Sequence, residues 1–428
     1  MITVLLGGTV ALGLYLAWTI GGNDFANSMG DAVGARAVSI PKAILLGALC
    51  ELAGSTLAGS HVTDTVRKGI VDPNHFAGAP ELVALGMMAA LLGTALWLHV
   101  ATLFGLPVST THSIVGGVAG FGVVGAGWAA VSWGTLSAIV MSWFISPLVG
   151  GILAYILFKL IVRFILGQSR PVDAAIRCAP SVIFVVVAVL VYSTMFKALG
   201  KKLAGTALEA TGPPAVILSV GLGIVAALIA RPMLAYRLRG RQNQPLSMQL
   251  SSIEAAFAPL VVITSCSVAF AHGANDVANA IGPVAAVMDI IQSGTVSMKA
   301  MVPYWLLGLG GIGIALGLAT YGYRVMLTIG TKITQLTPTR GVAADLAAST
   351  TVISCTLLKF PVSTTHTIVG AIIGVGFARG LGAVNRKVTR DIFGSWLITV
   401  PAAGLLSAVL FTAGRALGLA DLIRTSFP

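Results

Sequence analysis

Two short groups of amide and carboxylate residues lie inside long apolar stretches of the sequence. The groups consist of Asn23, Asp24 and Asn27, and of Asn275, Asp276 and Asn279. In a helix each Asp shares a face with the Asn three residues later. A carboxylate at the centre of a membrane helix costs about 2.5–3.5 kcal/mol on insertion scales, and no Lys or Arg lies nearby in either motif. Such oxygen-rich groups suit a hard cation such as Na⁺, and the alternative is a hydrogen-bonded cluster between helices.

Glycines flank both groups, at Gly21, Gly22 and Gly273. Because glycine tolerates backbone conformations that other residues avoid, we expect local unwinding that frees backbone carbonyls as further cation ligands.

Two runs of three hydroxyl residues each follow a Pro-Val dipeptide and precede an apolar stretch. They are Ser109, Thr110 and Thr111, and Ser363, Thr364 and Thr365. This pattern predicts capped helix N-termini, and a helix N-terminus binds anions without a fixed positive charge. Two such ends brought together would suit a tetrahedral oxyanion. The alternative is ordinary capping of two membrane helices.

A histidine follows each hydroxyl run, His112 in the first and His366 in the second. Each is a candidate proton carrier, metal ligand or simple hydrogen-bond partner.

Two further acids, Glu51 and Asp345, are each followed four residues later by Ser. A carboxylate can accept a hydrogen bond from hydrogen phosphate but repels fully ionised sulfate. We therefore predict a coupling or substrate-adjacent role for both acids. The alternatives are binding of the coupling cation, or pairing with Lys42 or Arg340.

The motifs occur twice and in the same order. Residues 107–116 and 361–370 agree at nine of ten positions, and the segments beginning at Glu51 and Asp345 form a third, weaker pair. Because the matched residues are rare polar ones, the chain is an internal duplication. We predict a first repeat over 1–166, an inserted helix pair and basic loop over 167–253, and a second repeat over 254–428.

The composition requires a membrane environment. The 428 residues are 56% hydrophobic and only 9% charged, against roughly 25% charged in a soluble domain. The net charge of +12 arises from basic gaps between apolar runs, so it indicates membrane orientation rather than nucleic-acid binding. We predict an all-α integral membrane protein with about 10–12 transmembrane helices. The stretch 128–166 is long enough for two, and the short segments 107–126 and 361–378 suit re-entrant hairpins or broken helices.

The distribution of basic residues favours inverted repeats. No charged residue occurs from Ser113 to Phe158, whereas Arg379, Arg386, Lys387 and Arg390 follow the second hydroxyl motif. The equivalent loops would then face opposite sides of the membrane. We predict a protein of the plasma (inner) membrane with both termini outside.

The duplicated motifs resemble those of the inorganic phosphate transporter (PiT) family. The family signature Gly-Ala-Asn-Asp-Val-Ala-Asn-Ala is intact at Gly273–Ala280, and Gly21–Ser28 is a variant that keeps its Asn-Asp-x-Ala-Asn core. The Pro-x-Ser-Thr-Thr-His element is also similar to that of the family, in both halves, and the resemblance covers essentially the whole chain.

This resemblance implies import of inorganic phosphate coupled to Na⁺ or H⁺. It places the family's acidic residues at Asp24, Asp276, Glu51 and Asp345, the last with Asp where the family usually has Glu. It places the substrate hydroxyls on the two Ser-Thr-Thr runs. It also implies a homodimer and a moving transport part against a scaffold.

We therefore predict a sodium-coupled phosphate symporter in the lipid bilayer, with Na⁺ as coupling ion and no organic cofactor. A proton-coupled phosphate symporter and a sulfate permease of the same family are alternatives, and a passive anion channel is an alternative from another class. No phosphate-binding loop, nucleophile elbow or zinc motif occurs, so we do not expect an enzyme.

Overall fold

A computed structural model describes residues 2–59, 69–76, 78–195, 212–296, 301–358 and 362–427, and these are almost entirely helical. The helices up to residue 194 are α1 (Ile2–Asp24), α2 (Ala26–Gly34), α3 (Ile40–Ala58), α5 (Pro80–Leu103), α6 (Thr110–Ala126), α7 (Trp133–Ile161) and α8 (Pro171–Thr194). Those that follow are α9 (Pro213–Arg237), α10 (Leu246–Ser293), α11 (Tyr304–Tyr321), α12 (Tyr323–Leu327), α13 (Pro338–Leu357), α14 (Thr364–Arg379), α15 (Arg386–Ala416) and α16 (Leu419–Arg424).

Nine helical segments in the described ranges are long and apolar enough to cross a membrane by length and composition. They carry large side chains exposed on their outer faces, such as Leu228 and Leu405, each 68% exposed, as expected where lipid is the solvent. The all-helical membrane fold is thus confirmed. The stretch 128–166 holds one long helix rather than two, since α7 accommodates Pro147 inside it and continues to Leu166 as a π-helical turn, η4 (Val162–Leu166).

The two helices that begin at the hydroxyl runs are short. α6 has 17 residues and α14 has 16, fewer than the roughly 20 that a span needs. Each is joined to the following long helix, α7 or α15, through a single 3₁₀ turn, η3 (Trp128–Ala130) or η7 (Leu381–Ala383). The expectation of short, broken segments holds at both places.

The expected unwinding beside the acidic motifs occurs in the first motif and not in the second, and the flanking glycines allow close contact between helix backbones. The helix is interrupted at Phe25, between α1 and α2, but α10 runs through the second motif without a break. A Cβ on Gly273 would lie 2.3 Å from the Glu51 carbonyl oxygen, and one on Gly21 would lie 1.8 Å from that of Ile314. The glycines therefore allow α10 to press on α3, and α1 on α11.

The helices of the two halves pack in a mirrored pattern. α7 packs on α14 as α15 packs on α6, and α10 packs on α3 as α1 packs on α11. α5 packs on α15 as α13 packs on α7. By this pattern the counterpart of α3 is α11, and the counterpart of α5 is α13.

The pairing of Glu51 with Asp345 as equivalent residues is therefore wrong. Glu51 lies on α3 and Asp345 on α13, which are not counterparts. Glu51 comes 27 residues after Asp24 (51 − 24), whereas Asp345 comes 69 after Asp276 (345 − 276). The order of motifs agreed between the halves, but the spacing did not.

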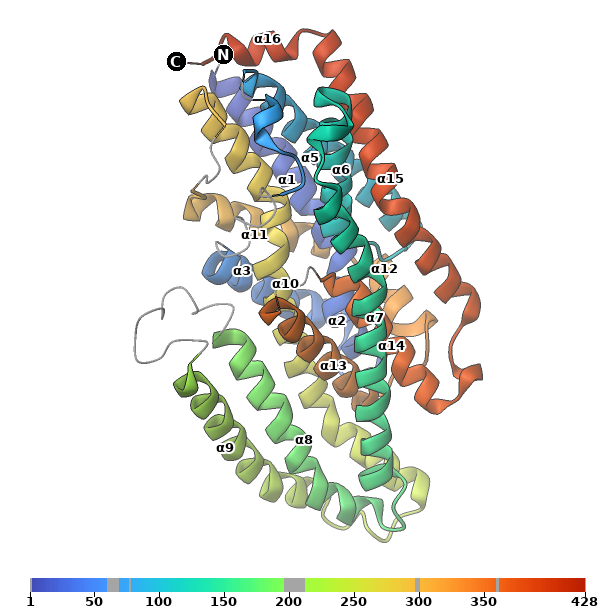
Figure 1. The fold of residues 1–428 in the computed structure, drawn as a ribbon. Helices are drawn as coiled ribbons and strands as arrows, with labels where there is room; N and C mark the ends of the chain where they lie inside the picture. The colour runs from blue at the N-terminus through green and yellow to red at the C-terminus, as the bar shows by residue number, and fades with distance from the viewer. Residues whose placement is uncertain are drawn as a thin grey trace.

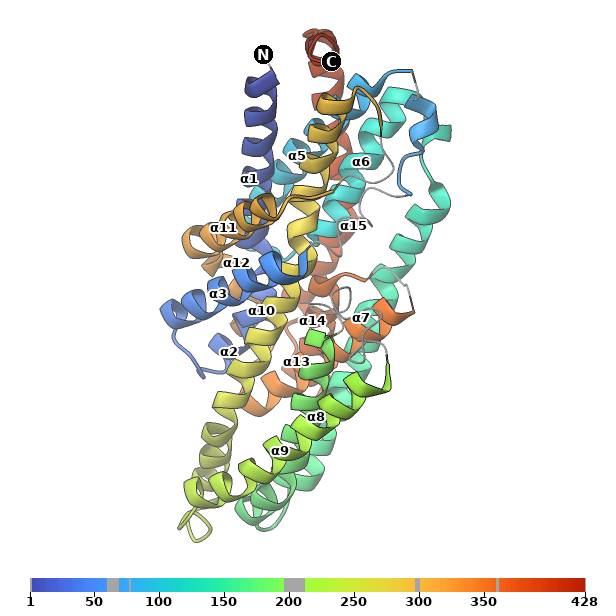
Figure 2. The ribbon, with the colours of Figure 1, turned by 90° about the vertical axis from the view of Figure 1, so that its left-hand side faces the viewer.

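The inserted helices α8 and α9 pack against each other, and α8 also packs on α10. Figures 1 and 2 show them at one end of the molecule, together with the connections that follow α7 and α9, while both termini lie at the opposite end. The connection after α7 contains Arg163 and Arg170, and the one after α9 contains Arg239 and Arg241, so both basic connections lie at one end.

Candidate functional site

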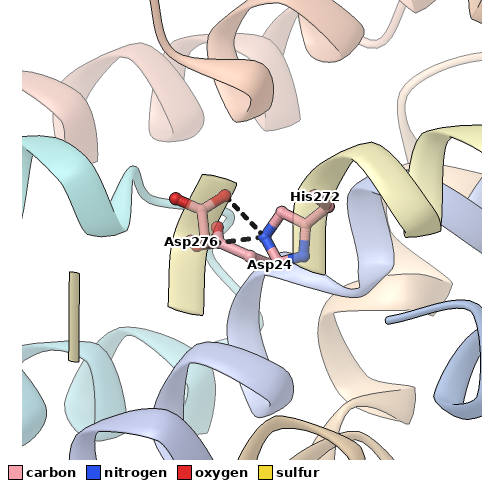
Figure 3. Close-up of side chains that lie close together, drawn as sticks. All are labelled: Asp24, His272 and Asp276. Atoms are coloured by element: carbon pink, nitrogen blue, oxygen red, sulfur yellow. Dashed lines mark ion pairs between the residues drawn. The ribbon is translucent and has the colours of Figure 1, made fainter. Parts of the chain in front are cut away.

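Three carboxylates from three helices converge on one histidine in the centre of the molecule. His272 Nδ1 lies 2.8 Å from Glu51 Oε1, and its Nε2 lies 3.0 Å from Asp276 Oδ2 and 3.8 Å from Asp24 Oδ2. Figure 3 shows the imidazole facing both aspartates. All four side chains are buried, so their charges interact without screening by bulk water.

The local sequence explains why these groups meet. His272 precedes Asp276 by four residues on α10, so both project from one face. Gly273 lets the α3 backbone approach at Glu51, which places that carboxylate against the imidazole. Sequence analysis missed His272, although its spacing from Asp276 was a usable signal. The first half has Ile20 at the corresponding position (272 − 252, from the offset between Asp276 and Asp24), so the duplication gave no signal there.

Each aspartate is bonded to a threonine from the other half. Thr365 Oγ1 donates to Asp24 Oδ1 at 2.9 Å, and Thr111 Oγ1 lies 3.4 Å from Asp276 Oδ1. The motif asparagines complete the same pattern. Asn27 donates to Thr365 at 2.9 Å, and Asn279 donates to Thr111 at 3.3 Å. We call these two sets of contacts the crossed pairs. In one, Asp24 and Asn27 bond to Thr365, and in the other, Asp276 and Asn279 bond to Thr111.

The symmetry ends at the neighbouring hydroxyls. Thr110 donates to Asp24 in a short hydrogen bond. Its counterpart Thr364 instead lines a pocket beside the cluster. Asp24 thus has Thr110 as its closest hydrogen-bond partner, whereas Asp276 has His272 in close contact.

The two serines cap their helices as predicted. Ser109 Oγ accepts from the His112 backbone N–H, and Ser363 Oγ accepts from that of His366, each at 3.3 Å. Their hydroxyl oxygens are thus engaged by the helix ends, and Thr110, Thr111 and Thr365 are the residues of the two runs that contact the carboxylates.

Asn23 is directed away from the carboxylates. Its amide nitrogen donates to Thr102 Oγ1 at 2.8 Å and to the Leu106 carbonyl at 3.0 Å, and its Oδ1 accepts from the Val108 N–H at 3.0 Å. These bonds fix the connection between α5 and α6 immediately before Ser109. Asn275 is only half-buried, unlike the other motif residues.

The two predicted histidines form an aromatic cluster. The rings of His112 and His366 are 4.7 Å apart and edge to face, His366 stacks on Trp396 at 3.6 Å, and His112 lies 5.0 Å from Trp143. This cluster joins the starts of α6 and α14 to α7 and α15.

Asp345 lies apart from the central carboxylates in its contacts. Its Oδ2 accepts from Thr264 at 2.6 Å and lies 3.1 Å from Ser265 Oγ. In the described ranges no salt bridge joins Glu51 to Lys42 or Asp345 to Arg340, and Glu51 contacts His272 instead.

A pocket opens beside the central cluster. Its polar lining comes from α2, α8, α10, α13 and α14, and comprises Asn27, Ser28, Ser193, Ser267, His272, Ser349 and Thr364. Hydroxyl, amide and imidazole groups can all donate hydrogen bonds. The lining therefore offers hydrogen-bond donors to an oxyanion, beside the apolar side chains Val268, Ala271, Ala348, Val352 and Ile368.

The cluster also fits a cation. One ligand atom each from Asp24, His272 and Asp276 lies within 4.8 Å of the others. Among the described residues, the buried Asn27 Oδ1 receives no hydrogen bond, and the close contact of Asp276 Oδ2 is His272 Nε2 at 3.0 Å. Carboxylate and amide oxygens are the ligands that a hard cation requires.

A multi-pass membrane fold around a buried cluster of ionisable side chains is typical of membrane transport proteins. The phosphate transporter family model matches residues 20–407, and the chain belongs to this family.

Similar proteins agree with this assignment. A putative phosphate permease of Pyrococcus abyssi is 48% identical over 406 residues, covering 94% of this chain and 96% of the relative. The chloroplastic inorganic phosphate transporter 2-1 of Arabidopsis thaliana is 40% identical and covers 94% of this chain and 71% of the relative. A solved structure described as the sodium-dependent phosphate transporter is 38% identical, with a TM-score of 0.85 over 96% of this chain and 99% of the solved chain.

Proposed function

We propose that this protein imports inorganic phosphate by symport with Na⁺. The observation that carries the proposal is the set of crossed pairs, in which the acidic motif of each half contacts the hydroxyl run of the other. The sodium dependence named for the similar solved structure also supports it.

Cations bind at the two aspartates. Asp24 with Asn27, and Asp276 with Asn279, supply the oxygens, and Glu51 holds His272 between them. Asn23 positions the start of α6 rather than serving as a ligand, because its amide is engaged by the α5–α6 connection.

Phosphate binds in the pocket beside the cluster, where Ser28, Ser193, Ser267, Ser349 and Thr364 offer hydroxyls. The threonines Thr110, Thr111 and Thr365 now bond to the carboxylates. When cations neutralise those carboxylates, the threonine hydroxyls become available to the anion.

Coupling then follows from charge. Three buried carboxylates and one imidazole leave the site negative, so an anion enters only after cations have arrived. The cations in turn are held more tightly when the anion is present, since the coupling free energy is reciprocal.

The mirrored packing supports two inverted repeats, 1–166 and 254–428, with 167–253 inserted between them. We further propose a homodimer in the plasma membrane with both termini outside. His112 and His366 hold the two hydroxyl-bearing helices together through their stacked rings.

The direct test is uptake of labelled phosphate into proteoliposomes under imposed Na⁺ or H⁺ gradients. We expect uptake to require Na⁺, to stop when choline replaces it, and to be lost in Asp24→Asn and Asp276→Asn. Uptake driven by H⁺ alone would instead indicate proton coupling, competition by sulfate a sulfate permease, and uptake without any cation gradient a channel. Wild-type rates in both variants would reject the site assignment.

A further inference from the structure

A second pair of carboxyl groups lies outside the central cluster. Asp31 on α2 and Asp345 on α13 are 1% and 0% exposed, and a single serine hydroxyl, Ser265 Oγ, lies between them. No salt bridge in the described ranges involves either residue. Two adjacent buried carboxylates cannot both stay ionised without a compensating positive charge.

The hydrogen-bond geometry shows where that charge is needed. Ser265 Oγ lies 3.0 Å from Asp31 Oδ1 and 3.1 Å from Asp345 Oδ2. A hydroxyl has one hydrogen, so only one of the two contacts can be donated by the serine. A hydrogen on one of the carboxyls makes both contacts favourable.

Each carboxyl also has one buried oxygen without a donor among the described residues, Asp31 Oδ2 and Asp345 Oδ1. The other oxygens are already engaged, since Asp31 Oδ1 accepts from the Ala32 N–H at 2.8 Å and Asp345 Oδ2 accepts from Thr264 at 2.6 Å. Each carboxyl thus has an oxygen that can carry a hydrogen, and one proton held by the pair neutralises one of the two buried charges.

Few other titratable groups face this pair. Cys266 on α10 follows Ser265 and contacts Cys50 on α3. Arg340 on α13 lies over the Phe158 ring at 5.7 Å, and Lys332, at the end of the π-helical turn η6 (Thr328–Lys332), is exposed. None of these supplies a counter-charge to the pair.

Asp31, Asp345 and the Ser265 between them lie on three of the five helices that line the pocket, two to four positions from a lining residue. On α2 the pocket residue Ser28 lies three positions from Asp31, and on α13 Ser349 lies four from Asp345. On α10 Ser267 lies two positions from Ser265. An interaction between Asp31 and Asp345 therefore holds together α2 and α13, two of the helices that line the pocket.

We propose that Asp31 and Asp345 form a proton-binding site that holds one proton between two carboxyls and clamps α2 to α13 beside the pocket. Loss of the proton leaves two like charges in contact, and the clamp opens. The proton site is independent of sodium coupling, and only its effect on uptake rests on the proposed function.

Infrared spectroscopy of the full-length protein in lipid tests the proton directly. At neutral pH we expect the carbonyl band of one protonated carboxyl per chain, lost in Asp31→Asn and in Asp345→Asn, retained in the exposed control Asp391→Asn, and unchanged when choline replaces Na⁺. Retention of the band in both pair variants would overturn the proposal. So would a band that appears only without Na⁺, because sodium would then be the occupant.

Transport tests the clamp. An amide at position 31 can donate permanently to the Asp345 carboxylate, so Asp31→Asn mimics the protonated pair. We expect the ratio of alkaline to neutral uptake to be higher in Asp31→Asn than in wild type or Asp391→Asn. All three meet the same phosphate species at each pH. Equal ratios of alkaline to neutral uptake in the three proteins would show that the pair does not clamp α2 to α13. If a variant fails to fold, the pH titration of the infrared band in the wild-type protein still tests the proton.

Discussion

At the scale of single residues, His272 determines the charge of the site. It contacts Glu51 and Asp276 at 2.8 and 3.0 Å, and in the described ranges no Lys or Arg forms a salt bridge with these acids. Removing one partner of a buried ion pair leaves an uncompensated charge and costs about 3–5 kcal/mol.

We expect His272→Gln to lower the thermal unfolding temperature and to abolish sodium-driven phosphate uptake. Added Na⁺ should raise the unfolding temperature more in the variant than in wild type, because the cation then has to compensate more negative charge. Unfolding scans of purified protein over a series of Na⁺ concentrations measure this. His75→Gln, at a half-exposed histidine, is the control. An equal sodium response in His272→Gln and wild type would argue against cation binding at the cluster.

The crossed pairs predict equal effects from opposite halves of the chain. Thr111→Val and Thr365→Val each remove a hydroxyl bonded to a carboxylate, and a hydrogen bond to a charged group contributes about 1.5–3 kcal/mol. We expect each to weaken apparent phosphate affinity by about 10- to 100-fold.

The measurement is the concentration dependence of labelled phosphate uptake at saturating Na⁺. The control is Thr412→Val, at a residue that is exposed and whose hydroxyl donates to the Ala408 carbonyl of its own helix at 2.8 Å. If the apparent phosphate affinity is unchanged in either threonine variant, the hydroxyl removed in that variant does not contribute to phosphate binding.

Much of the site could be predicted from residue types, and some could not. The meeting of the acidic and hydroxyl motifs followed from their duplication, because two related halves bring like motifs together. His272 has no duplicated counterpart. The bonds of Asn23 to Thr102 and Val108 depend on tertiary packing that no local pattern records. The order of motifs was not sufficient to predict an equivalence of Asp345 with Glu51, because the two residues lie on helices that are not counterparts.

At the scale of helices, close approach depends on glycine. A Cβ at position 273 would lie 2.3 Å from the Glu51 carbonyl oxygen, which is backbone and cannot rotate away. We expect Gly273→Ala to separate α10 from α3, to lower stability by about 1–3 kcal/mol and to reduce uptake strongly.

Thermal unfolding and sodium-driven uptake measure both effects. Gly221→Ala on α9 is the matched control, because a Cβ there meets nothing within 4 Å. Normal stability in Gly273→Ala would show that the helices can shift without cost, and would contradict the role of glycine in positioning Glu51.

The helices themselves were largely predictable, because long apolar runs leave few alternatives in lipid. The continuity of α7 through Pro147 was not, since a proline can either break or only kink a helix. The sequence also could not predict that the helix is interrupted at Phe25 in the first acidic motif and continuous through the second. The two motifs have nearly the same residues and differ in what packs around them.

At the scale of the whole molecule, both termini lie at one end and the basic connections at the other (Figure 1). By the positive-inside tendency the basic end faces the cytoplasm. In a cysteine-free background, we expect Arg241→Cys to react with an impermeant thiol reagent only from inside. Leu417→Cys, at a side chain 78% exposed, should react only from outside. Labelling of intact cells and of inverted vesicles measures this, and the reverse pattern would invert the proposed topology.

The crossed pairs have a consequence for the two halves of the chain. Asp24 depends on a hydroxyl beyond the chain's midpoint, and Asp276 on one before it. Neither half alone therefore supplies both the carboxylate and the hydroxyl of either crossed pair, so a polypeptide that ends between the halves lacks both pairs.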